Sequence, residues 1–129
     1  MAEKKQIYKC LVCGQTIEVL AGGAGQLVCC GQPMKHMEAN TEDASQEKHV
    51  PAAVREDGLL RVKVGSAPHP MMQEHYIEWI EVFCDKGCFR KRLHPGDVPE
   101  AVFPVPCAAT GLTVRIWCNL HGLWQAEVR

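Results

Sequence analysis

The chain has almost no excess of either charge: 14 lysines and arginines stand against 15 aspartates and glutamates, for a formal net charge of −1. Acidic and basic residues are interspersed, so bulk electrostatics gives no basis for binding nucleic acid or a charged membrane surface. The sequence also has no apolar run long enough to cross a bilayer. We therefore expect neither nucleic acid nor a membrane as a partner, and any electrostatic steering must be local.

An export signal is missing as well. The first residues, Met-Ala-Glu-Lys-Lys-Gln, are charged and lead directly to cysteines, without the apolar segment and cleavage site of a signal peptide. We expect a cytoplasmic protein, in a compartment where thiols stay reduced and disulfides are rare. The eight cysteines then favour metal ligation, because thiolates are ligands for soft metal ions.

Three regions of different composition follow one another. Residues 1–37 hold four cysteines around a glycine-rich stretch and are too few to fold on apolar burial alone, so we expect a bound metal to supply the missing stability. Residues 38–48 are polar and predict a linker. Residues 49–129 consist of short alternating segments separated by turn residues, which is typical of an antiparallel β-protein. No segment predicts a long helix, so the fold class is all-β: a small metal-binding domain and then a β-sandwich of about seven strands.

Alternation predicts the faces of individual strands. Leu60, Val62 and Val64 alternate with basic residues, which indicates a half-buried strand. In the run from Tyr76 to Phe83, the period of two places His75, Ile77 and Trp79 on one face and Glu78 on the other. Val114, Ile116 and Cys118 share a face in the same way.

A first metal site is predicted in the N-terminal region, from two turns that carry sulfur. Cys10 and Cys13 with Gly14 form a Cys-x-x-Cys-Gly turn that points two thiolates at one ion and aims backbone amides at sulfur. The adjacent Cys29 and Cys30 share that ion only if Gly31 makes a turn, because neighbouring side chains of a strand point to opposite faces. Four sulfurs in a distorted tetrahedron admit zinc or iron, and the spacing leaves both open.

A second site is predicted from five residues spread over the rest of the chain: His49, His69, His75, Cys118 and His121. Zinc sites usually close at four ligands. Four imidazoles and one thiolate suit iron and leave a sixth position for a small molecule. The anionic sulfur pushes electron density onto the metal.

These motifs, in their residues and in their order along the chain, resemble those of the desulfoferrodoxin family, the two-iron superoxide reductases. The N-terminal unit Tyr-Lys-Cys-Leu-Val-Cys-Gly with Cys-Cys-Gly resembles the desulforedoxin domain. The blocks Glu-Lys-His-Val-Pro, His-Pro-Met, His-Tyr-Ile-Glu-Trp-Ile and Cys-Asn-Leu-His-Gly-Leu-Trp resemble the catalytic domain. The resemblance implies a rubredoxin-like FeS4 domain at 1–37, an immunoglobulin-like β-sandwich at 49–129, and a homodimer. It also implies two iron ions per chain, with the four histidines equatorial and Cys118 axial at the second.

The same resemblance implies the activity. Superoxide is reduced by one electron to hydrogen peroxide, without release of dioxygen, as a detoxification under oxidative stress, and an external donor such as rubredoxin restores the ferrous ion. Lys48 resembles the residue that attracts the anion and organises water for proton delivery. Glu47 resembles the residue that caps the oxidised iron. For a lysine or glutamate in a polar stretch, a plain solvated side chain is the alternative.

The sequence leaves two other functions open: a non-catalytic iron electron carrier, and a zinc-stabilised binding module in which the histidines are incidental. Three cysteines fall outside both sites. Cys84 and Cys88 bracket a predicted hairpin turn, where a disulfide, a weak third metal site or a redox-sensitive pair are possible. For these two and for Cys107, burial as small apolar side chains is the favoured interpretation.

Overall fold

A computed structural model describes residues 2–41, 49–64, 69–84, 87–105 and 111–128. The chain divides into two compact units, Met1–Glu38 and Ala39–Arg129. The described residues form strands, turns and loops, and among them is no helix of the length and apolarity that crossing a membrane requires. The predicted linker falls largely on residues 42–48, outside the described residues, so its boundaries remain a prediction.

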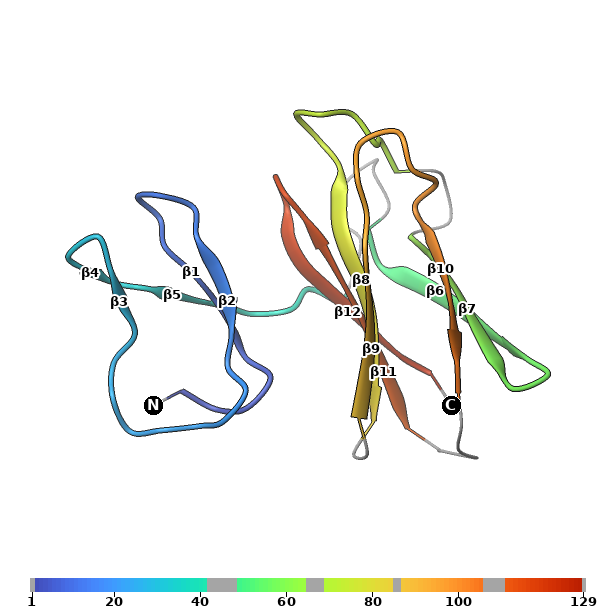
Figure 1. Cartoon of the computed structure of the whole chain (residues 1–129), viewed down its shortest axis with the longest axis horizontal. Coiled ribbons are helices and arrows are strands. Elements are labelled where there is room, and N and C mark those ends of the chain that lie inside the picture. The colour runs from blue at the N-terminus through green and yellow to red at the C-terminus, as the bar shows by residue number, and fades with distance from the viewer. Residues whose placement is uncertain (1, 42–48, 65–68, 85–86, 106–110, 129) are drawn as a thin grey trace. The chain divides into compact units, whose positions relative to one another are not determined.

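Unit 1 is a set of very short strands (blue to cyan in Figure 1). A three-stranded antiparallel sheet has the order β2-β1-β5, and a separate hairpin pairs β3 with β4. The bounds are β1 Ile7–Lys9, β2 Thr16–Glu18, β3 Val28–Cys29, β4 Gln32–Pro33 and β5 Lys35–Met37. Among its described residues only Ile7, Cys10 and Val19 are buried hydrophobic side chains. So small a core agrees with the expectation that apolar burial alone does not hold this unit together.

Unit 2 is a β-sandwich of seven antiparallel strands among the residues described. One sheet has the order β10-β7-β6 and the other β12-β11-β8-β9, and Figure 1 shows them as two layers. The bounds are β6 Pro51–Glu56, β7 Leu59–Val64, β8 Ile77–Cys84, β9 Gly87–Arg92, β10 Glu100–Pro104, β11 Leu112–Cys118 and β12 Gly122–Val128. The chain changes sheet between β7 and β8, between β9 and β10, and between β10 and β11, as in immunoglobulin-like sandwiches. The predicted all-β, two-part fold is confirmed.

The core lies between the two sheets and follows the predicted alternation. Along β7, Leu60, Val62 and Val64 are buried while their neighbours are exposed. Val114 and Ile116 of β11 face them with no exposed surface, and Cys118 continues the same face. Burying one side chain of this size stabilises the fold by about 1.5–3 kcal/mol. The alternation alone therefore fixes which face of each strand packs in the core.

The prediction for the face of Trp79 was wrong. Ile77 lies in the core with Ile80 and Val82, whereas Trp79 lies on the opposite face, where its ring stacks on Trp117 at 6.5 Å between centroids. The register between β8 and β11 shifts after Trp117, so that Cys118 pairs with Ile77 and not with Glu78. This bulge adds one residue to β8 and breaks the period of two on which the prediction relied.

A buried ion network occupies the face of β8 that also carries Trp79. Glu81 is only 1% exposed and lies opposite Arg115 in the register. Arg115 donates from Nε to Glu81 Oε1 at 2.5 Å, and Arg90 of β9 donates to Oε2 from Nε at 3.1 Å and from a terminal nitrogen. Arg90 also lies over the Trp79 ring at 5.0 Å. One carboxylate thus joins three neighbouring strands.

Candidate metal centres

The sulfur site is the set of four cysteines in unit 1: Cys10, Cys13, Cys29 and Cys30. Its first half is the turn after β1. The N–H of Cys13 points at Cys10 Sγ over 3.5 Å, and the N–H of Gly14 donates to the carbonyl of Cys10 at 2.9 Å. Cys10 is buried and Cys13 is exposed. The turn therefore has the predicted form, with both sulfurs on one side and a backbone amide directed at one of them.

The second half is the two-residue loop between β3 and β4. Cys29 pairs with Gln32, so Cys30 and Gly31 form the loop, with φ of +52° and +73°. Two consecutive positive φ values define the tight hairpin turn that glycine favours at its second position. This left-handed bend brings Cys30 to the same side as Cys29, as predicted from Gly31.

The four sulfurs fit a single tetrahedral ion. Cys13 and Cys29 have their Sγ atoms 3.6 Å apart, Cys29 and Cys30 are 3.9 Å apart, and all four lie within 4.8 Å of one another. A tetrahedral ion with metal–sulfur bonds of about 2.3 Å needs sulfurs about 3.8 Å apart. The set is therefore already close to the geometry that a metal requires.

The thiols of this site hold their protons unequally. The N–H of Cys13 lowers the pKa of Cys10 to about 6, because it stabilises the thiolate. Hydrogen bonds to Cys10 and then Cys13 raise the pKa of Cys29 to about 12, and a hydrogen bond to Cys13 raises the pKa of Cys30. A thiolate at Cys10 beside the protonated thiols of Cys29 and Cys30 is the pattern of a site that releases protons when a metal binds.

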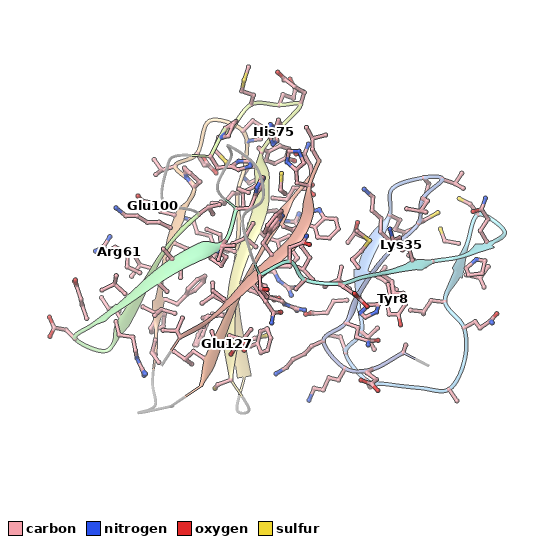
Figure 2. The ribbon with its side chains drawn as sticks, turned by 180° about the vertical axis from the view of Figure 1, so that it is seen from behind. Tyr8, Lys35, Arg61, His75, Glu100 and Glu127 are labelled. Atoms are coloured by element: carbon pink, nitrogen blue, oxygen red, sulfur yellow. The ribbon has the colours of Figure 1, made fainter. Side chains whose placement is uncertain are left out.

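The second set of donors, which we call the His4Cys set, gathers at one end of the sandwich, where Figure 2 labels His75. His49 precedes β6, His69 and His75 lie between β7 and β8, and Cys118 ends β11. His121 lies in the three-residue connection to β12, which closes at Gly122 with φ of +82°, as hairpin loops of this length do. All five residues predicted from sequence come together, with donor atoms within 4.8 Å of one another.

The four imidazoles form a closed cycle. Neighbouring rings meet edge to face at centroid distances of 4.7 Å for His49 and His69, 4.8 Å for His69 and His75, 5.1 Å for His75 and His121, and 4.8 Å for His121 and His49. Cys118 Sγ is 3.6 Å from His69 Nε2 and 3.7 Å from His121 Nδ1, which are opposite members of that cycle. Because the sulfur is at nearly equal distances from two opposite members and within 4.8 Å of the donor nitrogens of the other two, it lies near the axis of the cycle.

The donor atoms fit one ion. His121 Nδ1 and His49 Nε2 are 3.1 Å apart, close to the separation of about 3 Å for adjacent nitrogens bonded at about 2.1 Å to one metal. His69 Nδ1 lies 2.7 Å from the carbonyl oxygen of Pro70, so that nitrogen carries the proton and Nε2 presents its lone pair to the cycle. A backbone carbonyl on the far nitrogen is the usual support of a metal-binding histidine.

Burial divides the site into a closed part and an accessible part. His49, His69 and Cys118 are buried, His75 is half-buried and His121 is exposed. Burying the anionic thiolate of Cys118 away from water costs free energy, and a bound cation offsets that cost. The donor set therefore suits a cation that is shielded on its sulfur side and reached from outside past the rim that His75 and His121 form.

Two supporting residues were missed at the sequence level, although both lie within the quoted run Cys118–Trp124. The Trp124 indole stacks on His49, and its N–H donates to the His121 carbonyl at 3.1 Å. The Asn119 side chain bonds the backbone on both sides of His75. Asn119 stands between the predicted ligands Cys118 and His121, and Trp124 follows His121 by three residues. This closeness in the sequence was the signal that could have identified them.

Five further residues singled out in the sequence lie outside the two donor sets: two charged residues and three cysteines. Glu47 and Lys48 lie outside the described residues, as does Cys107. Cys84 is half-buried against the core, whereas Cys88 is exposed, so burial is wrong for Cys88. Cys88 pairs with Phe83 and Cys84 pairs with Gly87, which puts the two sulfurs on opposite faces of the sheet.

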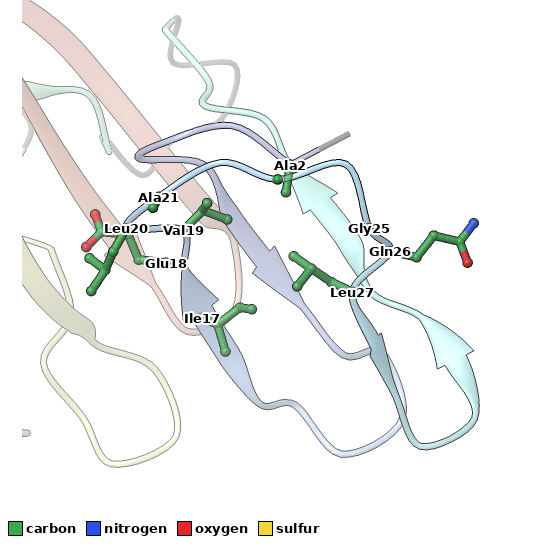
Figure 3. Close-up of a pocket in the computed structure, with 10 residues that line it drawn as sticks. Ala2, Ile17, Glu18, Val19, Leu20, Ala21, Gly25, Gln26 and Leu27 are labelled. Atoms are coloured by element: carbon green, nitrogen blue, oxygen red, sulfur yellow. The ribbon is translucent and has the colours of Figure 1, made fainter.

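Unit 1 also has a hollow of about 310 Å³ away from its cysteines (Figure 3). Its walls come from β2 and from the loop before β3, including Ile17, Val19, Leu20 and Leu27. Glu18 is the sole ionisable side chain among the lining residues, all of them small, apolar or amide otherwise. The hollow lacks the convergent polar groups of a binding site for a specific ligand.

Comparison with known proteins agrees with both sites. The chain matches the family "Desulfoferrodoxin, N-terminal domain" over residues 2–37 and the family "Desulfoferrodoxin" over residues 41–127. It is 55% identical to a desulfoferrodoxin homolog of Archaeoglobus fulgidus, covering 98% of this chain and 99% of the relative. It is 35% identical to a superoxide reductase of Pyrococcus horikoshii over 67% of this chain and 90% of that one. The solved superoxide reductase of Treponema pallidum has a TM-score of 0.77 at 26% identity, covering 97% and 99% of the two chains.

A short sulfur-ligand unit followed by a β-sandwich with a His4Cys set at one end defines a non-haem iron protein with two metal sites. The chain belongs to the desulfoferrodoxin family. Its sulfur site and its His4Cys set correspond to the two iron domains of that family.

Proposed function

We propose that this protein is a superoxide reductase whose reaction takes place at the His4Cys set. The observation that carries the proposal is the closed cycle of four imidazoles with the buried thiolate of Cys118 near its axis. The chemistry that bound iron supplies there is one electron for superoxide, which takes up two protons and leaves as hydrogen peroxide. The names of the similar proteins support the same activity.

The chain's own residues have distinct parts in this proposal. His49, His69, His75 and His121 hold the ion as neutral ligands, and Cys118 supplies the single anionic donor. Because Cys118 has no exposed surface, water screens its charge less than it would screen an exposed thiolate, which strengthens the attraction for the ion. Cys10, Cys13, Cys29 and Cys30 hold the second iron of the chain, in unit 1.

Glu47 and Lys48 are proposed to serve the same site because they immediately precede His49 in the sequence. A lysine at the mouth of a site raises the local concentration of a small anion such as superoxide and orders water for proton delivery. The carboxylate of Glu47 would supply a further oxygen ligand for the oxidised ion once the product has left. We expect Lys48→Ala to slow the reaction with superoxide, and Glu47→Ala to leave that rate unchanged while altering the visible spectrum of the oxidised site.

We also propose an electron donor, an oligomeric state and a location for this protein. An external one-electron donor such as rubredoxin re-reduces the iron, since each superoxide consumes one electron and the reaction is not self-sustaining. The chain works as a homodimer in the cytoplasm, where it removes superoxide under oxidative stress. Size-exclusion chromatography with light scattering tests the dimer directly.

The test of the function is anaerobic. The protein is isolated, its metals are counted, and a pulse of superoxide is added to the reduced form while hydrogen peroxide and dioxygen are measured. One peroxide per superoxide without dioxygen, lost in His49→Ala and in Cys118→Ser, is the expected result. Dioxygen in half the amount of superoxide indicates dismutation and contradicts the proposal.

The two alternatives give different results in the same experiment. An electron carrier contains two irons but forms peroxide no faster than buffer. A zinc-stabilised binding module contains zinc at the sulfur site and no iron at the His4Cys set. If zinc occupies the sulfur site and peroxide still forms, the protein is a superoxide reductase and the metal of unit 1 is structural.

A further inference from the structure

Asn119 lies between two of the donor residues and is not a donor itself. Its amide oxygen accepts the N–H of Tyr76 at 2.9 Å, and its amide nitrogen donates to the carbonyl of Glu74 at 3.1 Å. Its backbone N–H donates to the carbonyl of Tyr76 at 3.2 Å. One residue thus bonds the chain on both sides of His75.

The backbone of His75 itself is held by a different partner. Its N–H and carbonyl exchange two hydrogen bonds with Met72, at 3.0 and 2.9 Å. These two bonds fold residues 72–75 into a local turn but do not connect His75 to another residue of the His4Cys set. Asn119 supplies the connection, because it stands next to Cys118 and two residues before His121.

The side-chain amide of Asn119 matches the two backbone groups that it contacts. The two backbone groups that face it are a donor, Tyr76 N–H, and an acceptor, the Glu74 carbonyl. An asparagine amide offers an acceptor and a separate donor on the two atoms bonded to Cγ, whereas an ionised aspartate of the same length offers acceptors alone. The same requirement assigns the oxygen and the nitrogen of the amide without ambiguity.

We propose that Asn119 is a positioning residue of the His4Cys set, whose side-chain amide sets the place of His75 relative to Cys118 and His121. His75 closes the imidazole cycle between His69 and His121. If its backbone moves, its ring leaves the cycle and the ion loses one nitrogen. The inference rests on the proposed binding of metal by the His4Cys set, and not on the reduction of superoxide.

The test uses the full chain, freed of metal and titrated anaerobically with Fe²⁺ against a competing chelator. Asn119→Asp has the same shape but, when ionised, accepts only, so it turns a carboxylate oxygen toward the Glu74 carbonyl. We expect Asn119→Asp and Asn119→Ala to weaken Fe²⁺ binding at the His4Cys set by about 10–100-fold, the usual effect of losing a supporting contact. When the loaded site is then oxidised with a one-electron chemical oxidant, the absorption band from Cys118 to ferric iron shifts as well. The sulfur site keeps its affinity and serves as an internal reference.

The control variant is Thr113→Val, which removes an exposed hydrogen bond to Glu127 at the other end of β11. Figure 2 shows Glu127 near the end of the sandwich opposite His75. We expect this variant to bind Fe²⁺ as the wild type does. If Asn119→Ala does not fold, the isosteric Asn119→Asp still tests the proposal.

A double-mutant comparison separates positioning from general stability. In a His75→Ala background, Asn119→Asp has no ligand left to position, so we expect a further loss of less than about 3-fold. An undiminished loss in that background overturns the proposal, as does wild-type affinity and an unshifted band in the single variants. If the wild type itself binds no Fe²⁺ at the His4Cys set, the proposed function fails instead, and the two failures are thereby distinct.

Discussion

The indole of Trp124 stacks on the imidazole of His49, with 4.6 Å between ring centroids and 15° between the planes. The same indole donates its N–H to the backbone carbonyl of His121. One side chain therefore touches two members of the imidazole cycle that lie 72 residues apart in the sequence. Trp124 is also part of the sandwich core, so it links the packing of unit 2 to the geometry of the metal site.

Substitution of Trp124 separates these two roles. Trp124→Phe keeps a ring against His49 but loses the bond to His121, and we expect Fe²⁺ binding at the His4Cys set to weaken by about 10-fold. Trp124→Ala also leaves a cavity and lowers the free energy of unfolding by about 3–5 kcal/mol. Fe²⁺ competition and urea unfolding measure the two effects. Trp79→Phe, on the opposite face of the sheet, is the control, and an equal loss of Fe²⁺ affinity there contradicts this assignment.

Removal of metal is expected to unfold unit 1 and to spare unit 2. Among the described residues, unit 1 buries only Ile7, Cys10 and Val19 as hydrophobic side chains. Binding of a structural metal to such a unit is worth about 10–16 kcal/mol for zinc, more than so small a core supplies. Amide hydrogen exchange of the full chain, with and without chelator, is the measurement. Protection that persists in β1 and β5 after the metal is removed contradicts the prediction.

Glu81 is expected to be the most sensitive charged residue of unit 2. Glu81→Gln removes the negative charge that contacts the guanidinium of Arg115, whose side chain is 6% exposed. Breaking a buried pair from one side costs about 3–5 kcal/mol, measured here by urea unfolding. The matched control is Glu100→Gln, which breaks an exposed contact with Lys63 at 3.6 Å and costs less than about 1 kcal/mol. Equal costs for the two variants would contradict the role given to burial.

Cys84 and Cys88 are expected not to form a disulfide with each other in air. Their side chains lie on opposite faces of the β8–β9 hairpin, so a bond between them requires the register to change. Alkylation followed by mass spectrometry should find both cysteines reduced, with Cys88 labelled faster because it is exposed and Cys84 is half-buried. A mass two units lower that depends on both cysteines would refute this.

Much of the sulfur site is predictable from the sequence because its geometry is local. The Cys-x-x-Cys-Gly turn spans five residues, and the Cys30–Gly31 loop needs only two positive φ values. The core faces of β7 and β11 are predictable for the same reason, since alternation acts between near neighbours. The five donors of the second site were predicted from their residue types and from resemblance, without any account of how they meet.

Only the tertiary structure decided how the second site is assembled and supported. Its donors come from four places in the chain, and the pairing of β8 with β11, including the shift after Trp117, is what sets Cys118 beside the segment that carries His75. Asn119 reaches a backbone partner 43 residues away, and Trp124 reaches His49 across the fold. Contacts at such separations depend on strand register and bulges, which side-chain periodicity does not specify. The sequence by itself thus determined which residues are available to bind metal, whereas the packing of the sheets determined their order around it.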